Sequence, residues 1–407
     1  MRMRSRAWPA WALLVAGCAA GALGARDESV ESFVARHWRT PLSPQGPAPA
    51  RFTPLEASLA PEACGTCHPA QLADWRTSIH AAAMGPGVAG QLAELRVRDP
   101  ATALGCQNCH APLAEQMPLV PGTLADNPAF DAALGARGIP CAACHVRGHE
   151  RFGPPRRDGS LASAAPRETL PHGGVTRTPA YLASEFCRSC HQFGPDGYAL
   201  NGKPLEDTYE EWKASRFAAA GVQCQDCHMP DRRHLWRGIH DADMVRGGLT
   251  ITLDDAPPRV PGGVAARLVV ENSGVGHRFP TYVTPLVLLR AELVDAAGHA
   301  LAGTRVERPI GREVTLDLER EVSDTRLAPG ERAELVYARA LENGAVAARF
   351  SVVVYPDAFY TAFFEALLRQ GAGRGEDDVR RALGETRRSA FTVFEARVLP
   401  KGRLSPP

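Results

Sequence analysis

Five short motifs of cysteine and histidine lie between residues 64 and 228, and their spacing is the clearest chemical signal in the sequence. We number them motifs 1 to 5 in chain order: Cys64-Gly-Thr-Cys67-His68, Cys106-Gln-Asn-Cys109-His110, Cys141-Ala-Ala-Cys144-His145, Cys187-Arg-Ser-Cys190-His191 and Cys224-Gln-Asp-Cys227-His228. In a Cys-x-x-Cys-His motif the two thiols bond the edge of a c-type haem and the adjacent, proximal histidine binds its iron. The sequence therefore predicts five covalently attached haems, held by these cysteines and histidines.

Zinc sites and redox dithiols also use paired cysteines. A structural zinc site takes four ligands in a closed tetrahedron, and five cysteine pairs, each followed by histidine, do not group in that way. A redox dithiol of the thioredoxin kind occurs singly beside a βαβ pattern, which this sequence lacks. Haem attachment is the interpretation that accounts for all five motifs.

The sixth iron ligand decides what each haem does. A second, distal histidine closes the iron and gives a low-potential electron carrier, methionine raises the potential, and an open position admits a small substrate. The sequence has 13 histidines, so eight remain after the five proximal ones are assigned. Five irons with two histidines each are thus permitted, although the count alone does not show them.

His80 is the strongest distal candidate because of an internal repeat. Residues 74–83 align with residues 211–220 as acidic-Trp-basic-x-Ser-x-x-Ala-Ala-Ala, which indicates a duplicated haem-binding unit. Phe217 replaces His80 in the second copy, so the segment does not need histidine for packing. We predict a helix over residues 71–83 that presents His80 to an iron.

Four further histidines are predicted as distal ligands. His149 follows motif 3 so closely that a neighbouring iron suits it better than its own. His240 follows motif 5 and has an aspartate beside it as an orienting partner, with His234 as a nearby competitor. His172 lies in a glycine-rich loop where an exposed histidine is equally expected, and His277 lies in a glycine-rich turn that could reach over the haem region.

The start of the chain has the features of an export signal. Arginines precede a short apolar core from Trp11 to Ala16, so residues 1–25 are predicted to be a signal peptide. Val15-Ala16-Gly17-Cys18 resembles a bacterial lipobox, in which Cys18 would be lipidated and would anchor the protein to a membrane. The alternative is an ordinary signal cleaved near Ala25. Export is expected in both cases.

The rest of the chain divides by composition into an α + β multidomain protein. An N-terminal segment with a proline-rich linker (26–51) precedes a pentahaem cytochrome c domain of short helices and loops (52–245), followed by an antiparallel β-sandwich (246–400) and a tail (401–407). The sandwich strands are predicted at residues 249–253, 266–270, 286–289, 314–316, 333–337, 350–354 and 389–399, with a helix over 360–369.

Three further expectations follow from composition and spacing. With about forty residues per motif, the protein cannot build a sizeable core around each porphyrin, so the haems themselves must supply the core. Thr208 and Glu211 have the spacing of a capping box at the start of the second copy of the repeat. The net charge of +1 gives no reason to expect nucleic acid binding.

The motifs resemble those of multihaem cytochromes of the cytochrome c-554 type. The resemblance rests on Trp75-x-x-Ser78-x-His80 after motif 1, Gly148-His149 after motif 3, and Trp212-x-x-Ser215 with Met229-Pro230 around motif 5. It implies closely stacked haems that pass electrons, His80 as a distal ligand and His149 as a second one. Gly276-His277-Arg278-Phe279-Pro280-Thr281 resembles a turn in β-sandwiches appended to such cytochromes, which implies that His277 reaches a haem.

Two departures limit what the resemblance implies. The type member of the family has four haems and no β domain, so the partner and the order of the haems do not transfer. We therefore expect an exported electron carrier that exchanges electrons with other redox proteins of the cell envelope, in the periplasm or anchored to a membrane. The alternative is a reductase of a small nitrogen or sulfur oxyanion at one open haem. The ample histidines and the absence of a Cys-x-x-Cys-Lys motif favour the carrier.

Overall fold

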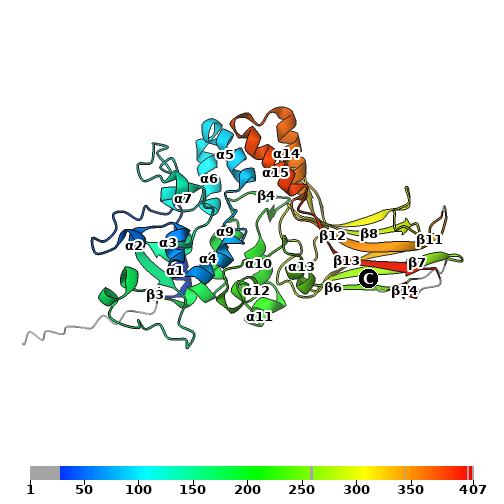
Figure 1. The fold of residues 1–407 in the computed structure, drawn as a ribbon, viewed down its shortest axis with the longest axis horizontal. Helices are drawn as coiled ribbons and strands as arrows, with labels where there is room; N and C mark the ends of the chain where they lie inside the picture. The colour runs from blue at the N-terminus through cyan, green and yellow to red at the C-terminus, as the bar shows by residue number, and fades with distance from the viewer. Residues whose placement is uncertain (1–27, 257–259, 343, 401–402, 406–407) are drawn as a thin grey trace, which may run out of the picture.

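The computed structural model describes residues 28–256, 260–342, 344–400 and 403–405. The predicted signal peptide and Cys18 lie outside the described residues. Short helices form the part of the chain before residue 249, and long strands dominate the part after it (Figure 1). No helix in the described part of the chain has the length and apolar character needed to cross a membrane.

Short helices carry motifs 2 to 5, while motif 1 begins in one helix and ends in the turn before the next. The helices of this part are α1 (Val30–His37), α2 (Pro54–Ala57), α3 (Pro61–Gly65), α4 (Pro69–Arg76), α5 (Pro86–Arg98), α6 (Pro100–His110), α7 (Ala132–Gly135), α8 (Cys141–His145), α9 (Glu185–His191), α10 (Thr208–Lys213), α11 (Arg216–Ala219), α12 (Cys224–His228) and α13 (Ala242–Gly248). Motif 3 forms α8 and motif 5 forms α12, while motifs 2 and 4 end α6 and α9. A helical turn places both cysteines of a motif on one face, because residues three apart are neighbours there.

Pairs of very short strands are the other regular structure in this part. They are β1 (Val146–Arg147), β2 (Glu150–Gly153), β3 (Thr176–Arg177), β4 (Ala199–Leu200) and β5 (Lys203–Pro204). Strands β1 and β2 pair antiparallel directly after motif 3, and β3 joins β2 in parallel. The hairpin of β4 and β5 follows motif 4.

Two antiparallel sheets form the β-sandwich. The strands are β6 (Leu249–Asp255), β7 (Gly263–Asn272), β8 (Leu286–Val294), β9 (Val306–Val314), β10 (Glu321–Asp324), β11 (Arg332–Ala340), β12 (Ala347–Tyr355), β13 (Phe391–Leu399) and β14 (Arg403–Ser405). One sheet has the order β10-β9-β8-β12-β13-β14 and the other β11-β7-β6. Along β11, buried and exposed residues alternate, as expected of a strand with one face on a core.

The hydrophobic clusters show how differently the two parts are stabilised. A large cluster lies between the two sheets and includes Leu268 from β7, Leu289 from β8 and Phe350 from β12. In the motif-bearing part the protein supplies only small clusters, one around Leu113 and one around Phe33. This difference is what we expect if bound haems complete the core of the first part.

A helical hairpin between β12 and β13 leaves the sandwich and packs on the motif-bearing part. It consists of α14 (Ala358–Gln370) and α15 (Glu376–Thr386), and Figure 1 shows it beside α5 and α6. A Cβ atom at Gly90 of α5 would lie 2.9 Å from a methyl group of Val379, so the glycine permits this close packing. The sequence predicted a helix over 360–369, but α15 was missed.

Two element predictions were wrong at their ends. The helix predicted over 71–83 stops at Arg76, because the hydroxyls of Thr77 and Ser78 donate to the carbonyls of Asp74 and Trp75, to which a continuing helix would bond. His80 therefore lies in a turn. The strand predicted at 314–316 begins earlier, at Val306, and ends at Val314.

A buried arginine joins the two parts of the chain. Arg312 on β9 is almost fully buried and donates to Glu321 at 2.8 Å and to the carbonyl oxygens of Leu200, Lys203 and Pro204 in the β4–β5 hairpin. One side chain thus satisfies three carbonyls of a segment that follows motif 4. A buried guanidinium can bond several acceptors in a fixed plane, which fixes the hairpin on the sheet.

We predict that Arg312→Ala lowers the free energy of unfolding by about 3–5 kcal/mol, because a buried network loses its cation. Arg332→Ala is the control: Arg332 pairs with Glu271 while 62% exposed, and such a pair contributes roughly 0–1 kcal/mol. Denaturant unfolding followed by circular dichroism compares the two variants. Equal midpoints would show that the Arg312 contacts do not stabilise the fold.

Candidate functional site

Three pairs of histidine rings lie at nearly the same separation. In each pair one ring is the proximal histidine of a motif and the other comes from a distant segment. The ring centres are 6.4 Å apart for His80 and His191, 6.2 Å apart for His145 and His234, and 6.3 Å apart for His228 and His277. These pairs belong to motifs 4, 3 and 5.

This separation fits an iron atom between the rings. A metal–imidazole nitrogen bond is about 2 Å long. Each ring centre lies about 1 Å beyond its nitrogen, so two rings on opposite sides of one metal have centres about 6 Å apart. The three pairs therefore have the spacing that a haem iron with two histidine ligands requires.

The hydrogen bonds of the rings leave the ligating nitrogen free. Nδ1 of His145 bonds the carbonyl oxygen of Phe152 at 2.8 Å, and Nδ1 of His228 bonds that of Arg237 at 2.6 Å. Two of the distal rings follow the same rule: Nδ1 of His277 bonds the carbonyl of Arg278 at 2.8 Å, and Nδ1 of His234 bonds that of Arg232 at 3.1 Å. A second partner on Nδ1 fixes the tautomer and the orientation of a ring whose Nε2 binds metal.

Burial keeps the paired rings neutral. It lowers the pKa of His80 to about 3, with smaller contributions from the nearby His191 and His228. Burial likewise lowers the pKa of His145, His191 and His277 to about 4. Neutral imidazole is the form that binds a metal.

Cysteines of different motifs lie near one another. The thiols of Cys64 and Cys141 are close enough for each to shift the pKa of the other, which joins motif 1 to motif 3, and the same holds for Cys187 and Cys224, which join motif 4 to motif 5. A third pair, Cys109 and Cys190, joins motif 2 to motif 4. The porphyrin edges bonded at these cysteines would therefore be neighbours.

Trp236 connects two of the ring pairs. Its ring centre lies 4.7 Å from that of His80 and 5.2 Å from that of His234. His80 faces motif 4 and His234 faces motif 3, so the indole lies between the distal sides of these two sites. Trp236 has a φ of 43°, as expected for a residue in a tight, irregular turn.

Two of the predicted distal histidines, His149 and His240, are placed differently. Nε2 of His149 bonds the carbonyl oxygen of Gly46 at 2.9 Å, and Nε2 of His240 bonds a carboxylate oxygen of Asp357 at 3.0 Å. Both rings thus use the nitrogen that would bind iron. His172 keeps Nε2 free and bonds through Nδ1 to the carbonyl of Gly174. Its pKa is lowered mainly by burial and in small part by His68, so it lies in the same region as motif 1.

His234 is the residue that the sequence ranked too low. The prediction placed His240 ahead of it, yet His234 is the one opposite a proximal histidine. Its position was readable: it follows motif 5 by only a few residues, which hinders binding to its own iron and favours a neighbouring one.

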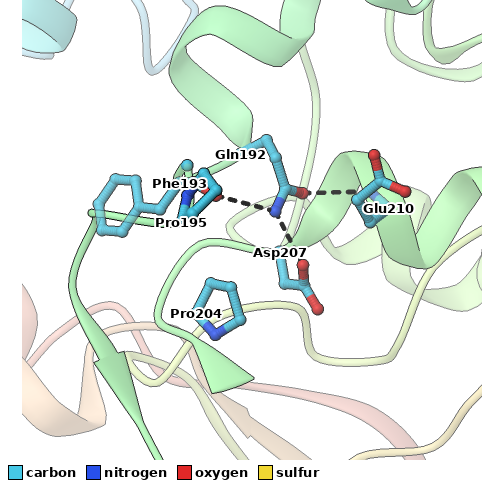
Figure 2. A pocket seen from close by; sticks show the side chains of 7 residues that line it. Gln192, Phe193, Pro195, Pro204, Asp207 and Glu210 are labelled. Atoms are coloured by element: carbon cyan, nitrogen blue, oxygen red, sulfur yellow. Dashed lines mark hydrogen bonds between the residues drawn. The ribbon is translucent and has the colours of Figure 1, made fainter. Parts of the chain in front are cut away.

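The segment after motif 4 is fixed by polar contacts. Figure 2 shows Gln192, the residue after the proximal His191, at a pocket of about 400 Å³ that Asp207 and Glu210 also line. The Gln192 amide donates to Asp207 at 2.8 Å and accepts from the backbone N–H of Glu210 at 3.1 Å. Motif 4 is thereby attached to the start of α10.

The predicted capping box at Thr208 and Glu211 is wrong. The N-cap of α10 is Asp207, and no side chain caps the helix. The Thr208 hydroxyl instead donates to Glu206 at 2.7 Å and lies 2.6 Å from the hydroxyl of Thr281, the neighbour of Tyr282, whose own hydroxyl lies 2.9 Å from Nδ1 of His191. Thr208 thus supports the proximal histidine of motif 4 rather than the helix end.

In the described residues no group of three or more histidine, cysteine, aspartate or glutamate side chains is arranged to hold a metal ion. A tetrahedral zinc site would need such a group. Two histidines on opposite faces of a haem need none, because the porphyrin supplies the other four ligands.

We predict that His234→Ala converts one haem of the purified protein from low spin to high spin, because it removes the ring opposite His145. His149→Ala, which removes a ring bonded to Gly46, should leave every haem unchanged. Electron paramagnetic resonance (EPR) of the oxidised protein, at equal haem content, measures both. A high-spin signal in the His149 variant alone would refute the pairing of His145 with His234.

Comparisons with known proteins concern the family and the fold. Residues 63–148, which contain motifs 1 to 3, match the family described as cytochrome c554 and c-prime. No curated protein matches the sequence. The fold is similar to that of a penta-heme cytochrome c552 from Thermochromatium tepidum, with a TM-score of 0.55 and 19% identity over 85% of this chain and 100% of that one. Motifs, fold and family match lead to one conclusion: the chain is a multihaem c-type cytochrome that resembles the cytochrome c-554 family.

Proposed function

We propose that this protein is an exported pentahaem cytochrome that relays electrons in the cell envelope. The observation that carries the proposal is the set of three ring pairs at the spacing of an iron with two histidine ligands. Such irons have no free position for a substrate, and they exchange electrons without binding one. Bound haem supplies the redox chemistry, and the chain supplies the ligands and the spacing.

The proximity of the motifs supports a connected path. Neighbouring cysteines join motif 1 to motif 3, motif 4 to motif 5 and motif 2 to motif 4. Trp236 lies between the distal sides of motifs 3 and 4. We propose that electrons pass along motifs 1, 3, 4 and 5, with motif 2 attached as a branch at motif 4.

The β-sandwich has a role in this proposal beyond support. The turn between β7 and β8 carries His277, which faces motif 5, and Tyr282, which bonds the proximal histidine of motif 4. The sandwich therefore completes two haem sites. Its outer surface remains available to another redox protein, and Cys18 would anchor the whole protein if it is lipidated.

We expect five haems per chain by pyridine haemochrome assay. In the oxidised protein, the EPR signals assigned to motifs 3, 4 and 5 should be low spin and should not change on addition of nitrite or hydroxylamine, because both faces of each iron are closed. A high-spin haem at any of these three motifs that shifts with nitrite would contradict the proposed ligands. It would support the alternative of a reductase acting on a small nitrogen oxyanion.

A further inference from the structure

Two tryptophans make the same contact in two distant places. The indole N–H of Trp75 donates to the carbonyl oxygen of Ile139 at 2.8 Å, and that of Trp212 donates to the carbonyl of Val222 at 2.9 Å. Ile139 and Val222 each lie two residues before the first cysteine of a motif, motif 3 and motif 5 respectively. Both indoles are buried, so each hydrogen bond is shielded from water.

The backbone repeats the match. The N–H of Ile139 donates to the carbonyl of His80 at 2.9 Å, and the N–H of Val222 donates to that of Phe217 at 3.0 Å. His80 and Phe217 occupy equivalent positions of the sequence repeat. Each residue before the motif is thus held through both its N–H and its C=O.

A glycine with positive φ precedes the held residue in both copies. The φ angles are 62° at Gly138 and 78° at Gly221. At Gly138 a Cβ atom would lie 2.4 Å from the carbonyl oxygen of His80, so a side chain there would push the two segments apart.

The acidic residue before each tryptophan holds a different segment. Asp74 accepts from the Arg233 guanidinium at 2.6 and 2.7 Å and from the backbone N–H of His234 at 3.1 Å. Glu211 accepts from the Arg326 guanidinium at 3.0 Å and from the backbone N–H of Arg278 at 3.1 Å. Both carboxylates are largely buried. Each therefore bonds one arginine and the backbone at, or next to, a distal histidine.

The two contacts meet at one site in each copy. Trp75 holds motif 3 while Asp74 holds His234, and His234 faces the proximal histidine of motif 3. Trp212 holds motif 5 while Glu211 holds the residue after His277, which faces the proximal histidine of motif 5. Each acidic-Trp pair thus connects the two sides of one ring pair.

The two copies differ in the length of chain between the repeat segment and the motif that it holds. In the first copy residues 81–138, with motif 2, lie between His80 and Ile139, whereas in the second only residues 218–221 lie between Phe217 and Val222. Despite this difference in chain length, the tryptophan, backbone and carboxylate contacts are the same in both copies. Because the contacts are the same although 58 residues are inserted in one copy and four in the other, we infer that the haem site requires them.

We propose that Asp74-Trp75 and Glu211-Trp212 are equivalent positioning pairs, each of which sets the distance between the two axial histidines of one haem, at motif 3 and motif 5 respectively. The proposal rests on the ligand pairs of the proposed function. The indole fixes the proximal side, the carboxylate fixes the distal side, and the short covalent link between them sets the separation.

The test is a reciprocal pair of substitutions in the haem-loaded, full-length protein. Asp74→Ala should abolish one low-spin signal, the same signal that His234→Ala abolishes and that is thereby assigned to motif 3. Glu211→Ala should abolish a different low-spin signal, the one that His277→Ala abolishes and that is thereby assigned to motif 5. Asp74→Asn and Glu211→Gln keep an oxygen that accepts from the backbone N–H, so they should retain most of the low-spin signal. EPR of the oxidised variants measures the low-spin and high-spin signals in each case.

Milder variants cover the case in which an alanine variant does not fold. Trp75→Phe and Trp212→Phe remove the indole N–H and leave a smaller apolar ring, and each should shift the g values of the same haem as its acidic neighbour while the other low-spin haems keep theirs. Tyr337→Phe, which removes a buried donor to the carbonyl oxygen of Thr304 in the sandwich, is the matched control and should shift neither haem of motifs 3 and 5.

Two results would overturn the proposal. The first is that both acidic variants weaken all low-spin haems equally, as a general loss of folding would. The second is that neither variant changes its haem although the histidine variants do. If instead His234→Ala and His277→Ala leave every haem low spin, the ligand assignment fails, which is a failure of the proposed function and is seen without the positioning variants.

Discussion

A haem iron with two histidine ligands requires ring centres about 6 Å apart, and the chain must hold both rings at that distance from segments far apart in the sequence. For His145 and His234, 89 positions apart in the numbering, the observed separation is 6.2 Å. A misplacement of about 1 Å would break a coordination bond, so the segments around the rings need fixed points. Regular helices and strands are too short in this part of the chain to provide them.

Polar contacts to the backbone provide those fixed points instead. Buried carboxylates, indoles and arginines bond main-chain groups next to the motifs, where a hydrophobic core is small. The sandwich is organised differently, with a continuous apolar core between two sheets. The sandwich fixes one haem ligand directly. Asn272 at the end of β7 is fully buried, and its side chain donates to the carbonyl oxygen of His277 at 2.9 Å. A stable sheet thus positions a ligand for a less regular neighbour.

The sequence predicted the parts whose signals are local. The five motifs, the change to strands predicted near residue 246 and the choice of His80 and His277 all follow from short patterns, and both histidines face a proximal ring. The pairing of distant segments was not readable. Because residues 81–138 are inserted between them, the sequence does not show that Trp75 bonds the segment before motif 3. Nor does a single sequence show that the rings of His149 and His240 would bond Gly46 and Asp357. These outcomes depend on which backbone groups meet after folding.

The central claim is that an iron lies between the rings of each pair. X-ray diffraction from crystals of the haem-loaded protein, collected at the iron absorption edge, locates every iron directly. The account predicts anomalous peaks midway between His80 and His191, between His145 and His234, and between His228 and His277. Irons bound by a proximal histidine with no second ring opposite, at these three motifs, would contradict it.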